Sequence, residues 1–309
     1  MLFPQPLRKN PLKRDKLKCI SLLYRMLLSQ MKTKKSNLQV CCLCGPSAGT
    51  RRKNLEEPYF LWKCNLCNLV QLFPKPTEKQ LAEIYSIDYF RSPDSGYRDY
   101  NSQEVSLRNT YKAMLKKYEM DLVDKSVLDV GSGPGYFLKL AKESGARSLF
   151  AIEPAIQVHS QLRTMNIEIL GENIGNVKVA APLDLISCFQ TLEHIPDPVD
   201  FLKKMFDFLD HDGLLVISVP NYNSWLRMFL GKKWPSYKVP EHLTYFTKDT
   251  LGLTLKKAGL SHFTIAKMEH YFPFSILQEN GIAILPNRWA SKLFRLRSTS
   301  LIALVTKGD

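Results

Sequence analysis

The chain has 309 residues, of which 45 % are hydrophobic, enough for a packed core that needs no disulfide bonds. Its formal charge of +14 is concentrated in residues 1–38, which contain ten Lys or Arg and one acid, whereas the rest of the chain has 33 basic and 28 acidic residues. No stretch approaches the roughly 18 to 20 apolar residues of a membrane span and no cleavage site follows the leader, so the sequence excludes a transmembrane protein and predicts a cytoplasmic one.

Residues 1–38 form a basic leader that we expect to be disordered. Arg25 interrupts the apolar patch at 20–28, which argues against a secretory signal peptide. A basic amphipathic helix that rests on an anionic membrane is the functional alternative. Met31 is a second candidate start, because MKTKKSNLQVCCLCG is typical of an N-terminus.

A zinc-ribbon-like module is predicted over residues 39–76. Nineteen residues separate two Cys-x2-Cys pairs, and this spacing offers four thiolates to one tetrahedral zinc ion: Cys41, Cys44, Cys64 and Cys67. An all-cysteine site leaves no open coordination position, so the metal would stabilise the fold rather than activate water. Cys42 lies between the ligands and is expected to be a bystander. Redox chemistry at the two pairs is the alternative.

A helical linker is predicted over residues 77–124. Two prolines in the preceding LFPKP segment interrupt regular structure, and Thr77 with Gln80 has capping-box spacing, which predicts a short helix through residues 81–85. Apolar side chains at helical spacing over residues 104–120 predict a longer helix. We expect this helix to pack against the domain that follows.

Strands and helices alternate over residues 125–309. Helical segments, including one over residues 199–209, separate most of the predicted strands, which lie at 127–130, 149–152, 167–170, 183–189 and 214–219. This alternation predicts an α/β domain with a Rossmann-like, doubly wound, mostly parallel sheet. Ligands of such sheets bind at the carboxyl ends of the strands, so side chains at those ends are candidates for a site.

The stretch VLDVGSGPGYF, residues 127–137, leads from a strand into a glycine loop. Its glycines let a ligand approach the backbone closely, but the last of them does not stand where a nicotinamide dinucleotide fingerprint requires it. Glu153 ends the next strand, 22 residues after Gly131, where a carboxylate can accept hydrogen bonds from two ribose hydroxyls. The glycine loop and Glu153 together predict that the ligand is a nucleoside with a charged tail.

Three segments resemble the class I S-adenosylmethionine-dependent methyltransferases. Residues 129–135, DVGSGPG, look like motif I of that family, Glu153 looks like its ribose-binding acid, and residues 189–198, FQTLEHIPDP, are similar to the segment after its fourth strand. The resemblance covers about residues 125–261 and implies a seven-stranded sheet with S-adenosylmethionine as the cofactor. It also implies cofactor-binding roles for Asp129, Gly131, Ser132, Gly133, Gly135, Glu153 and Gln190.

A looser resemblance concerns the substrate. The four cysteines, the LVQLFPKP segment and the Tyr89-Phe90 pair resemble the N-terminal part of a subset that includes C-methyltransferases of nucleotide-linked keto-deoxysugars. The largest of those enzymes carry a further C-terminal domain, whereas the roughly fifty residues after Ser261 suffice only to complete the sheet. A Glu-His pair at a similar position of the keto-sugar enzymes is implicated in deprotonation, which implies catalytic roles for Glu241 and His242.

Several features near the expected site also have structural explanations. For His194 a hydrogen bond at a helix entry is the favoured explanation, whereas for His242 capping or bracing its loop is nearly as good an explanation as catalysis. The aromatic and basic insertion at 221–239 is expected either to cover a phosphorylated or sugar-like substrate or to pack as a lid. Asp197 and Pro198 receive no catalytic role, because they have the residue types of an N-cap and a first helical position.

The sequence therefore predicts methyl transfer to a small-molecule acceptor, a sugar or another cell-envelope or secondary-metabolite intermediate, by in-line displacement with a Glu-His general base. The alternative is an RNA methyltransferase whose zinc module grips a nucleic acid. Against it, the fourth strand ends in FQTLEH rather than the Asn-Pro-Pro-Tyr type associated with methylation of base amino groups. A binding protein without chemistry is a third alternative, which the intact glycines and Glu153 disfavour.

Overall fold

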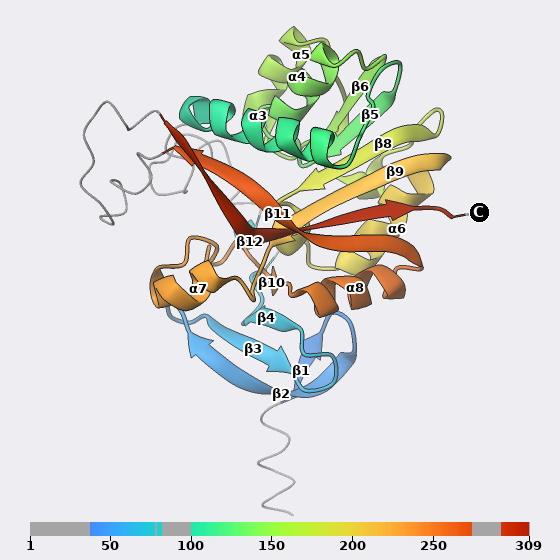
Figure 1. Ribbon diagram of the computed structural model, residues 1–309. Coiled ribbons are helices and arrows are strands. Elements are labelled where there is room, and N and C mark those ends of the chain that lie inside the picture. The colour runs from blue at the N-terminus through green and yellow to red at the C-terminus, as the bar shows by residue number, and fades with distance from the viewer. Residues whose placement is uncertain (1–37, 78, 82–99, 274–291, 309) are drawn as a thin grey trace, which may run out of the picture.

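The computed structural model describes residues 38–77, 79–81, 100–273 and 292–308. In this part of the chain a large α/β unit lies above a smaller antiparallel sheet (Figure 1). The expectations for the basic leader, for most of the helix at 81–85 and for the Tyr89-Phe90 pair fall outside the described residues. No helix among the described residues is long and apolar enough to cross a lipid bilayer.

Seven strands form one mixed sheet in the order β11-β12-β9-β8-β5-β6-β7. The strands are β5 (Ser126–Val130), β6 (Ser148–Ile152), β7 (Glu168–Gly171), β8 (Leu183–Phe189), β9 (Leu209–Pro220), β11 (His262–Pro273) and β12 (Leu293–Thr306). The five from β7 to β9 run parallel, whereas β12 lies antiparallel to β9 and β11 antiparallel to β12. The predicted Rossmann-like, mostly parallel, seven-stranded sheet is thus confirmed.

Helices cover both faces of this sheet (Figure 1). One face carries α3 (Tyr100–Lys117), α4 (Tyr136–Glu143) and α5 (His159–Thr164), and the other carries α6 (Pro198–Phe208) and α8 (Lys248–Lys257). Each face has its own apolar core, in which Phe137 and Leu162 are buried on the first side and Leu202 and Leu255 on the second. This two-sided cover explains why the central strands β5 and β8 are buried along nearly their whole length.

Asp197 caps α6 as its residue type predicts. Its Oδ1 atom accepts hydrogen bonds from the backbone N–H groups of Val199 and Asp200, both at 3.1 Å, and Pro198 occupies the first turn. The helix begins one residue before the expected 199–209.

Replacing Asp197 by Ala is expected to lower the free energy of unfolding by about 1 kcal/mol, the usual effect of losing an N-cap side chain. Urea denaturation of the purified chain measures this difference. Asp207→Ala is the matched control, because it removes an exposed acid from the last turn of the same helix, where a negative charge opposes the helix dipole. Equal loss of stability in both variants would contradict the capping role.

The smaller sheet is completed by a strand from far along the chain. Its order is β1-β2-β3-β4-β10, all antiparallel neighbours: β1 (Leu38–Cys41), β2 (Gly45–Asn54), β3 (Phe60–Cys64), β4 (Val70–Phe73) and β10 (Thr244–Tyr245). Leu72 also donates its N–H to the carbonyl of Leu243, at 2.9 Å. The segment predicted as a separate module is therefore joined to the larger unit by backbone hydrogen bonds.

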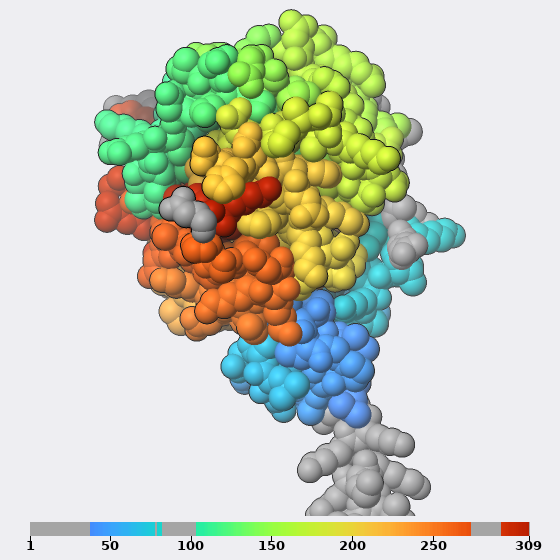
Figure 2. Space-filling model, turned by 90° about the vertical axis from the view of Figure 1, so that its right-hand side faces the viewer, coloured from blue at the N-terminus to red at the C-terminus, as the bar shows by residue number. Residues whose placement is uncertain are grey.

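Apolar packing joins the two sheets as well. Trp62, Leu69 and Phe73 of the smaller sheet belong to the same buried cluster as Leu251 and Leu255 of α8. Figure 2 shows the blue residues of this sheet packed against the orange residues of α8. The smaller sheet is therefore tied to the larger unit at two places, through the packing against α8 and through β10.

Candidate active site

The glycine loop follows β5 and depends on backbone conformations that favour glycine. Gly131 has a φ of +78° and Gly135 a φ of +81°. A Cβ atom on Gly131 would lie 2.3 Å from Oγ1 of Thr191, and one on Gly135 would lie 2.6 Å from Cδ2 of Leu162. Both positions are therefore closed to larger residues by conformation and by packing.

Glu153 follows β6 and holds this loop through its carboxylate. One oxygen accepts the backbone N–H of Gly133 at 2.6 Å, and the other accepts that of Ala155 at 2.9 Å. The side chain is buried, and burial raises the pKa of its carboxyl group above the ordinary range. The acid and the glycine loop are thus one hydrogen-bonded unit at the carboxyl edge of the sheet.

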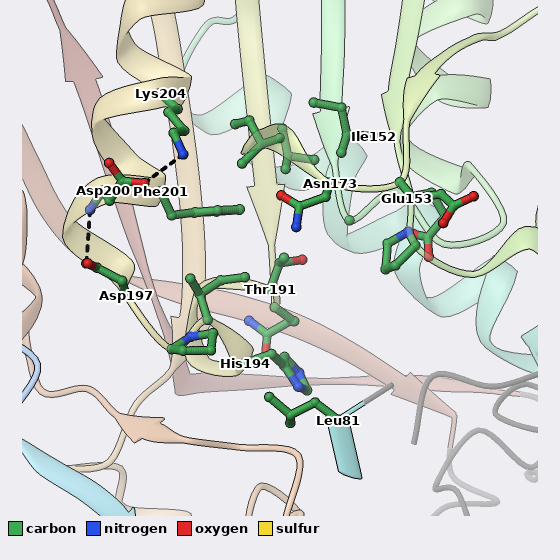
Figure 3. Close-up of a pocket in the computed structure, with 18 of the residues that line it drawn as sticks. Leu81, Ile152, Glu153, Asn173, Thr191, His194, Asp197, Asp200, Phe201 and Lys204 are labelled. Carbon is green, nitrogen blue, oxygen red and sulfur yellow. Dashed lines mark hydrogen bonds and ion pairs between the residues drawn. The ribbon is translucent and has the colours of Figure 1, made fainter. Parts of the chain in front are cut away.

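A cavity of about 470 Å³ opens at this edge (Figure 3). Gly131, Gly133, Glu153 and Gln190 line it, together with Lys204 on α6. Figure 3 shows Glu153 and Ile152 on one side and Phe201, Asp200 and Lys204 on the other. The volume lies within the range of small-molecule sites, and the site stands where open α/β sheets bind ligands.

The other predicted cofactor residues lie outside the cavity wall. Ser187 donates its hydroxyl hydrogen to Asp129 at 2.7 Å, and burial raises the pKa of Asp129 to about 7. Asp129, Ser132 and Gly135 are not among the lining residues, so they support the loop from behind. The structure thus brings Gly131, Gly133, Glu153 and Gln190 to one cavity.

The predicted catalytic pair is adjacent to this cavity but does not line it. His194, from the 3-10 turn Leu192–His194, lines the cavity, and its ring packs edge-on against that of His242 with a centroid distance of 4.6 Å. Burial lowers the pKa of His194 to about 3 and that of His242 well below its ordinary value, and the positive charge of Lys238 lowers both further. Both imidazoles are therefore neutral near pH 7.

Glu193 received no role in the sequence analysis, yet it is the most unusual acid near the cavity. It is 1 % exposed, and neither carboxylate oxygen has a hydrogen-bond partner among the described residues. The Nδ1 atom of His242 is likewise unpaired there. Burial raises the pKa of Glu193 to about 8. The sequence offered one signal for a role of this acid, namely that Glu193 stands beside His194 in the short turn that follows the strand ending at Phe189.

The insertion at 221–239 contains α7 (Trp225–Leu230). Its residues Tyr222, Trp234 and Tyr237 pack on one another, whereas Trp225 and Phe229 are exposed. The Trp234 ring lies 6.2, 4.9 and 6.4 Å from those of Tyr222, Tyr237 and Tyr245, measured between centroids, and Trp234 is buried. This contact between Tyr222, Trp234 and Tyr237 is the packing that one of the two alternatives predicts for these residues. It fixes the loop that leads to His242 against the smaller sheet.

The four cysteines predicted as ligands converge at the edge of the smaller sheet. The four Sγ atoms all lie within 4.8 Å of one another, and those of Cys41 and Cys67 are 3.6 Å apart. The cysteines are Cys41, Cys44, Cys64 and Cys67. The Cys67 hydrogen bond lowers the pKa of Cys41 to about 5. Zn–S bonds of about 2.3 Å in a tetrahedron require sulfur separations of this size. Cys42 stands apart, and burial raises its pKa to about 12.

Comparison with known proteins gives one family match. A model of the methyltransferase domain matches residues 98–263. The ubiquinone biosynthesis O-methyltransferase of Serratia proteamaculans is 27 % identical over 129 residues, covering 39 % of this chain and 54 % of that protein. The enzyme of the same name from Neisseria meningitidis is 28 % identical over 164 residues, which cover 43 % of this chain and 69 % of that protein. The chain spans about half the length of the first of these curated relatives.

Solved structures with similarity to the chain include two methyltransferases. A SAM-dependent methyltransferase from Archaeoglobus fulgidus matches with a TM-score of 0.48 and 19 % identity, covering 68 % of this chain and all of that one. An S-adenosylmethionine-dependent methyltransferase from Clostridium acetobutylicum matches with a TM-score of 0.44 and 15 % identity. The match covers 75 % of this chain and 99 % of that one.

Proposed function

Because the chain belongs to the family of methyltransferase domains, we propose that it transfers the methyl group of S-adenosylmethionine to a small-molecule acceptor. The observation that carries this proposal is the hydrogen-bonded unit of Glu153 and the glycine loop at one cavity. The names of the relatives refer to O-methylation in ubiquinone biosynthesis, which favours an acceptor of small-molecule size. A sugar or another cell-envelope or secondary-metabolite intermediate is the acceptor class we propose, in the cytoplasm.

The cofactor residues would divide their tasks by position. Glu153 would accept hydrogen bonds from the ribose hydroxyls, and Gly131 and Gly133 would let the methionine part approach the backbone. Gln190 lies across the cavity, where its amide donates to the Ser218 hydroxyl at 3.1 Å. Asp129, supported by Ser187, would keep the end of β5 in place.

His242, with Glu241 beside it, is the general base we propose. A lone pair of the acceptor attacks the methyl carbon, the carbon–sulfur bond breaks with its electron pair going to sulfur, and the acceptor proton passes to the imidazole. A base must be neutral before it accepts a proton, and the buried His242 ring is neutral near pH 7. His194 lines the cavity and contacts the ring of His242, so it would guide the proton between them.

Replacing His242 by Ala is expected to lower methyl transfer by about 10²- to 10⁴-fold, the usual contribution of a general base, without weakening cofactor binding. The assay follows labelled methyl groups from S-adenosylmethionine into the small-molecule fraction of a cell extract, and calorimetry measures cofactor affinity. His211→Ala removes an exposed imidazole and is the matched control. Full turnover by the His242 variant would exclude the base role.

We also propose that the four-cysteine cluster holds a structural zinc ion. The close approach of the four sulfurs supports this assignment, since a set of four thiolates would repel one another without a cation. The ion would have no open position for water, so its contribution would be to the stability of the smaller sheet.

A further inference from the structure

A second group of metal-binding side chains lies between the cysteine cluster and the cofactor cavity. One donor atom from each of Glu193, His194 and His242 lies within 4.8 Å of the other two. Glu193 is 1 % exposed and His242 is 5 % exposed, whereas His194 is partly exposed and lines the cavity. Glu193 and His242 are therefore shielded from solvent, and the group reaches the cavity through His194.

Three polar atoms of Glu193 and His242 have no hydrogen-bond partner in the part of the chain that the structure describes. They are both oxygens of Glu193 and the Nδ1 atom of His242. Buried polar atoms without partners cost free energy, so an arrangement that collects three of them in one place needs a physical reason. A cation shared by these atoms supplies that reason.

The surroundings of the two imidazoles have the form that metal ligands require. The ring of His194 hydrogen-bonds to the backbone carbonyl of Glu241, and that of His242 to the backbone carbonyl of Ser236. A carbonyl that accepts one ring N–H fixes the tautomer and directs the lone pair of the other nitrogen. The backbone hydrogen bond from Leu243 to the Glu193 carbonyl, at 2.9 Å, holds the acid and the His242 loop together.

We propose that Glu193, His194 and His242 bind a divalent transition-metal ion beside the cofactor cavity. Two imidazoles and one carboxylate, with further positions open to the cavity, form a ligand set suited to ions such as Zn²⁺, Fe²⁺ or Mn²⁺. Bonds of about 2.0–2.2 Å to a central ion place ligand atoms roughly 3 to 4 Å apart, within the observed limit. Lys238 opposes a cation here, and the negative charge that Glu193 gains when the ion displaces its proton would offset this repulsion.

The ion would act on the acceptor, and this consequence rests on the proposed function. A hydroxyl oxygen bound to the ion loses its proton more readily, so the ion would hold the acceptor as an alkoxide or phenoxide before methyl transfer, with the proton released to water. While the ion is bound, His242 serves as a ligand and not as the base, because one lone pair cannot hold both a metal and a proton. The two roles of His242 are therefore separable by experiment.

Binding of Mn²⁺ to the full chain tests the site directly. Mn²⁺ prefers oxygen and nitrogen ligands to thiolates, which keeps it out of the cysteine cluster. Equilibrium dialysis with elemental analysis is expected to find one Mn²⁺ per wild-type chain. Glu193→Gln, which keeps the side-chain shape, is expected to weaken binding by more than about 100-fold, since loss of an outer partner alone costs about 10- to 100-fold. Glu172→Gln, an exposed acid of the same cavity, should bind as the wild type does.

His194→Gln at the cavity wall is the second variant and covers the case in which Glu193→Gln fails to fold. Unchanged Mn²⁺ affinity in the folded variants, or no binding by the wild type, would overturn the proposal. Methyl transfer that survives complete metal removal and is lost in His242→Ala would also overturn it while the proposed function stands. Mn²⁺ binding by a protein that methylates nothing would instead contradict the proposed function alone.

Discussion

Replacing Glu153 by Gln is expected to weaken S-adenosylmethionine binding by about 10- to 100-fold. The carboxylate accepts the N–H groups of Gly133 and Ala155 with its two oxygens, and an amide can accept with only one. Hydrogen bonds to a charged group contribute about 1.5–3 kcal/mol, which corresponds to a change of this size in affinity. The variant therefore loses both its contact to the ribose and part of the support for the glycine loop. Isothermal titration calorimetry measures the change.

The control for this experiment is Glu172→Gln, which removes the same charge from an exposed position of the same cavity. It is expected to keep wild-type affinity within about twofold, because Glu172 is exposed and water and salt screen a charge at such a position. Equal affinity in the two variants would show that the general charge of the cavity, and not the Glu153 carboxylate, determines cofactor binding.

Replacing Cys64 by Ser is expected to remove one zinc ion per chain and to lower methyl transfer as well as the unfolding temperature. Structural zinc contributes roughly 10–16 kcal/mol of apparent binding free energy in small zinc domains, so its loss leaves the smaller sheet unstable. β4 of that sheet pairs with β10 through Gln71 and Val70, close to His242. The effect on activity would therefore arise through the position of the His242 loop. Elemental analysis, thermal unfolding and the labelled-methyl assay together measure it.

Cys42→Ser is the matched control, because Cys42 is the neighbouring thiol that stands outside the cluster. It is expected to keep its zinc and its activity. A wild-type protein that contains no zinc, or a Cys64 variant that retains the full zinc content, would contradict the assignment of the cluster as a metal site.

The fold was predictable wherever one local pattern decided it. The strands at 183–189 and 149–152 are apolar runs that only a sheet covered on both faces can bury, and the structure has them at these positions or one residue longer. Asp197 was predictable as a cap because its hydrogen-bond partners, the N–H groups of Val199 and Asp200, lie only two and three residues further along the chain. The start of β9 at Leu209 was missed, because the exposed residues 210–212 interrupt the apolar pattern although Leu209 already pairs with Leu183.

The candidate site was predictable in part, for a similar reason. The glycine loop and Glu153 lie at the ends of neighbouring strands, so topology alone brings them together. The contact between His194 and His242, by contrast, joins segments from two loops, which are also linked by the backbone hydrogen bond from Leu243 to Glu193. The two-residue strand β10, which follows Leu243, carries no periodic signal that would have placed this segment beside Glu193. Long-range contacts of this kind are not encoded in any local window of sequence.

One measurement tests the central claim most directly. Purified protein is incubated with methyl-labelled S-adenosylmethionine and a cell extract, and the RNA, protein, lipid and soluble small-molecule fractions are then separated and counted. The proposed function predicts label in the small-molecule or lipid fraction, and loss of that label with Glu153→Gln at limiting cofactor. Label confined to RNA, or no label in any fraction from protein that binds the cofactor, would contradict it.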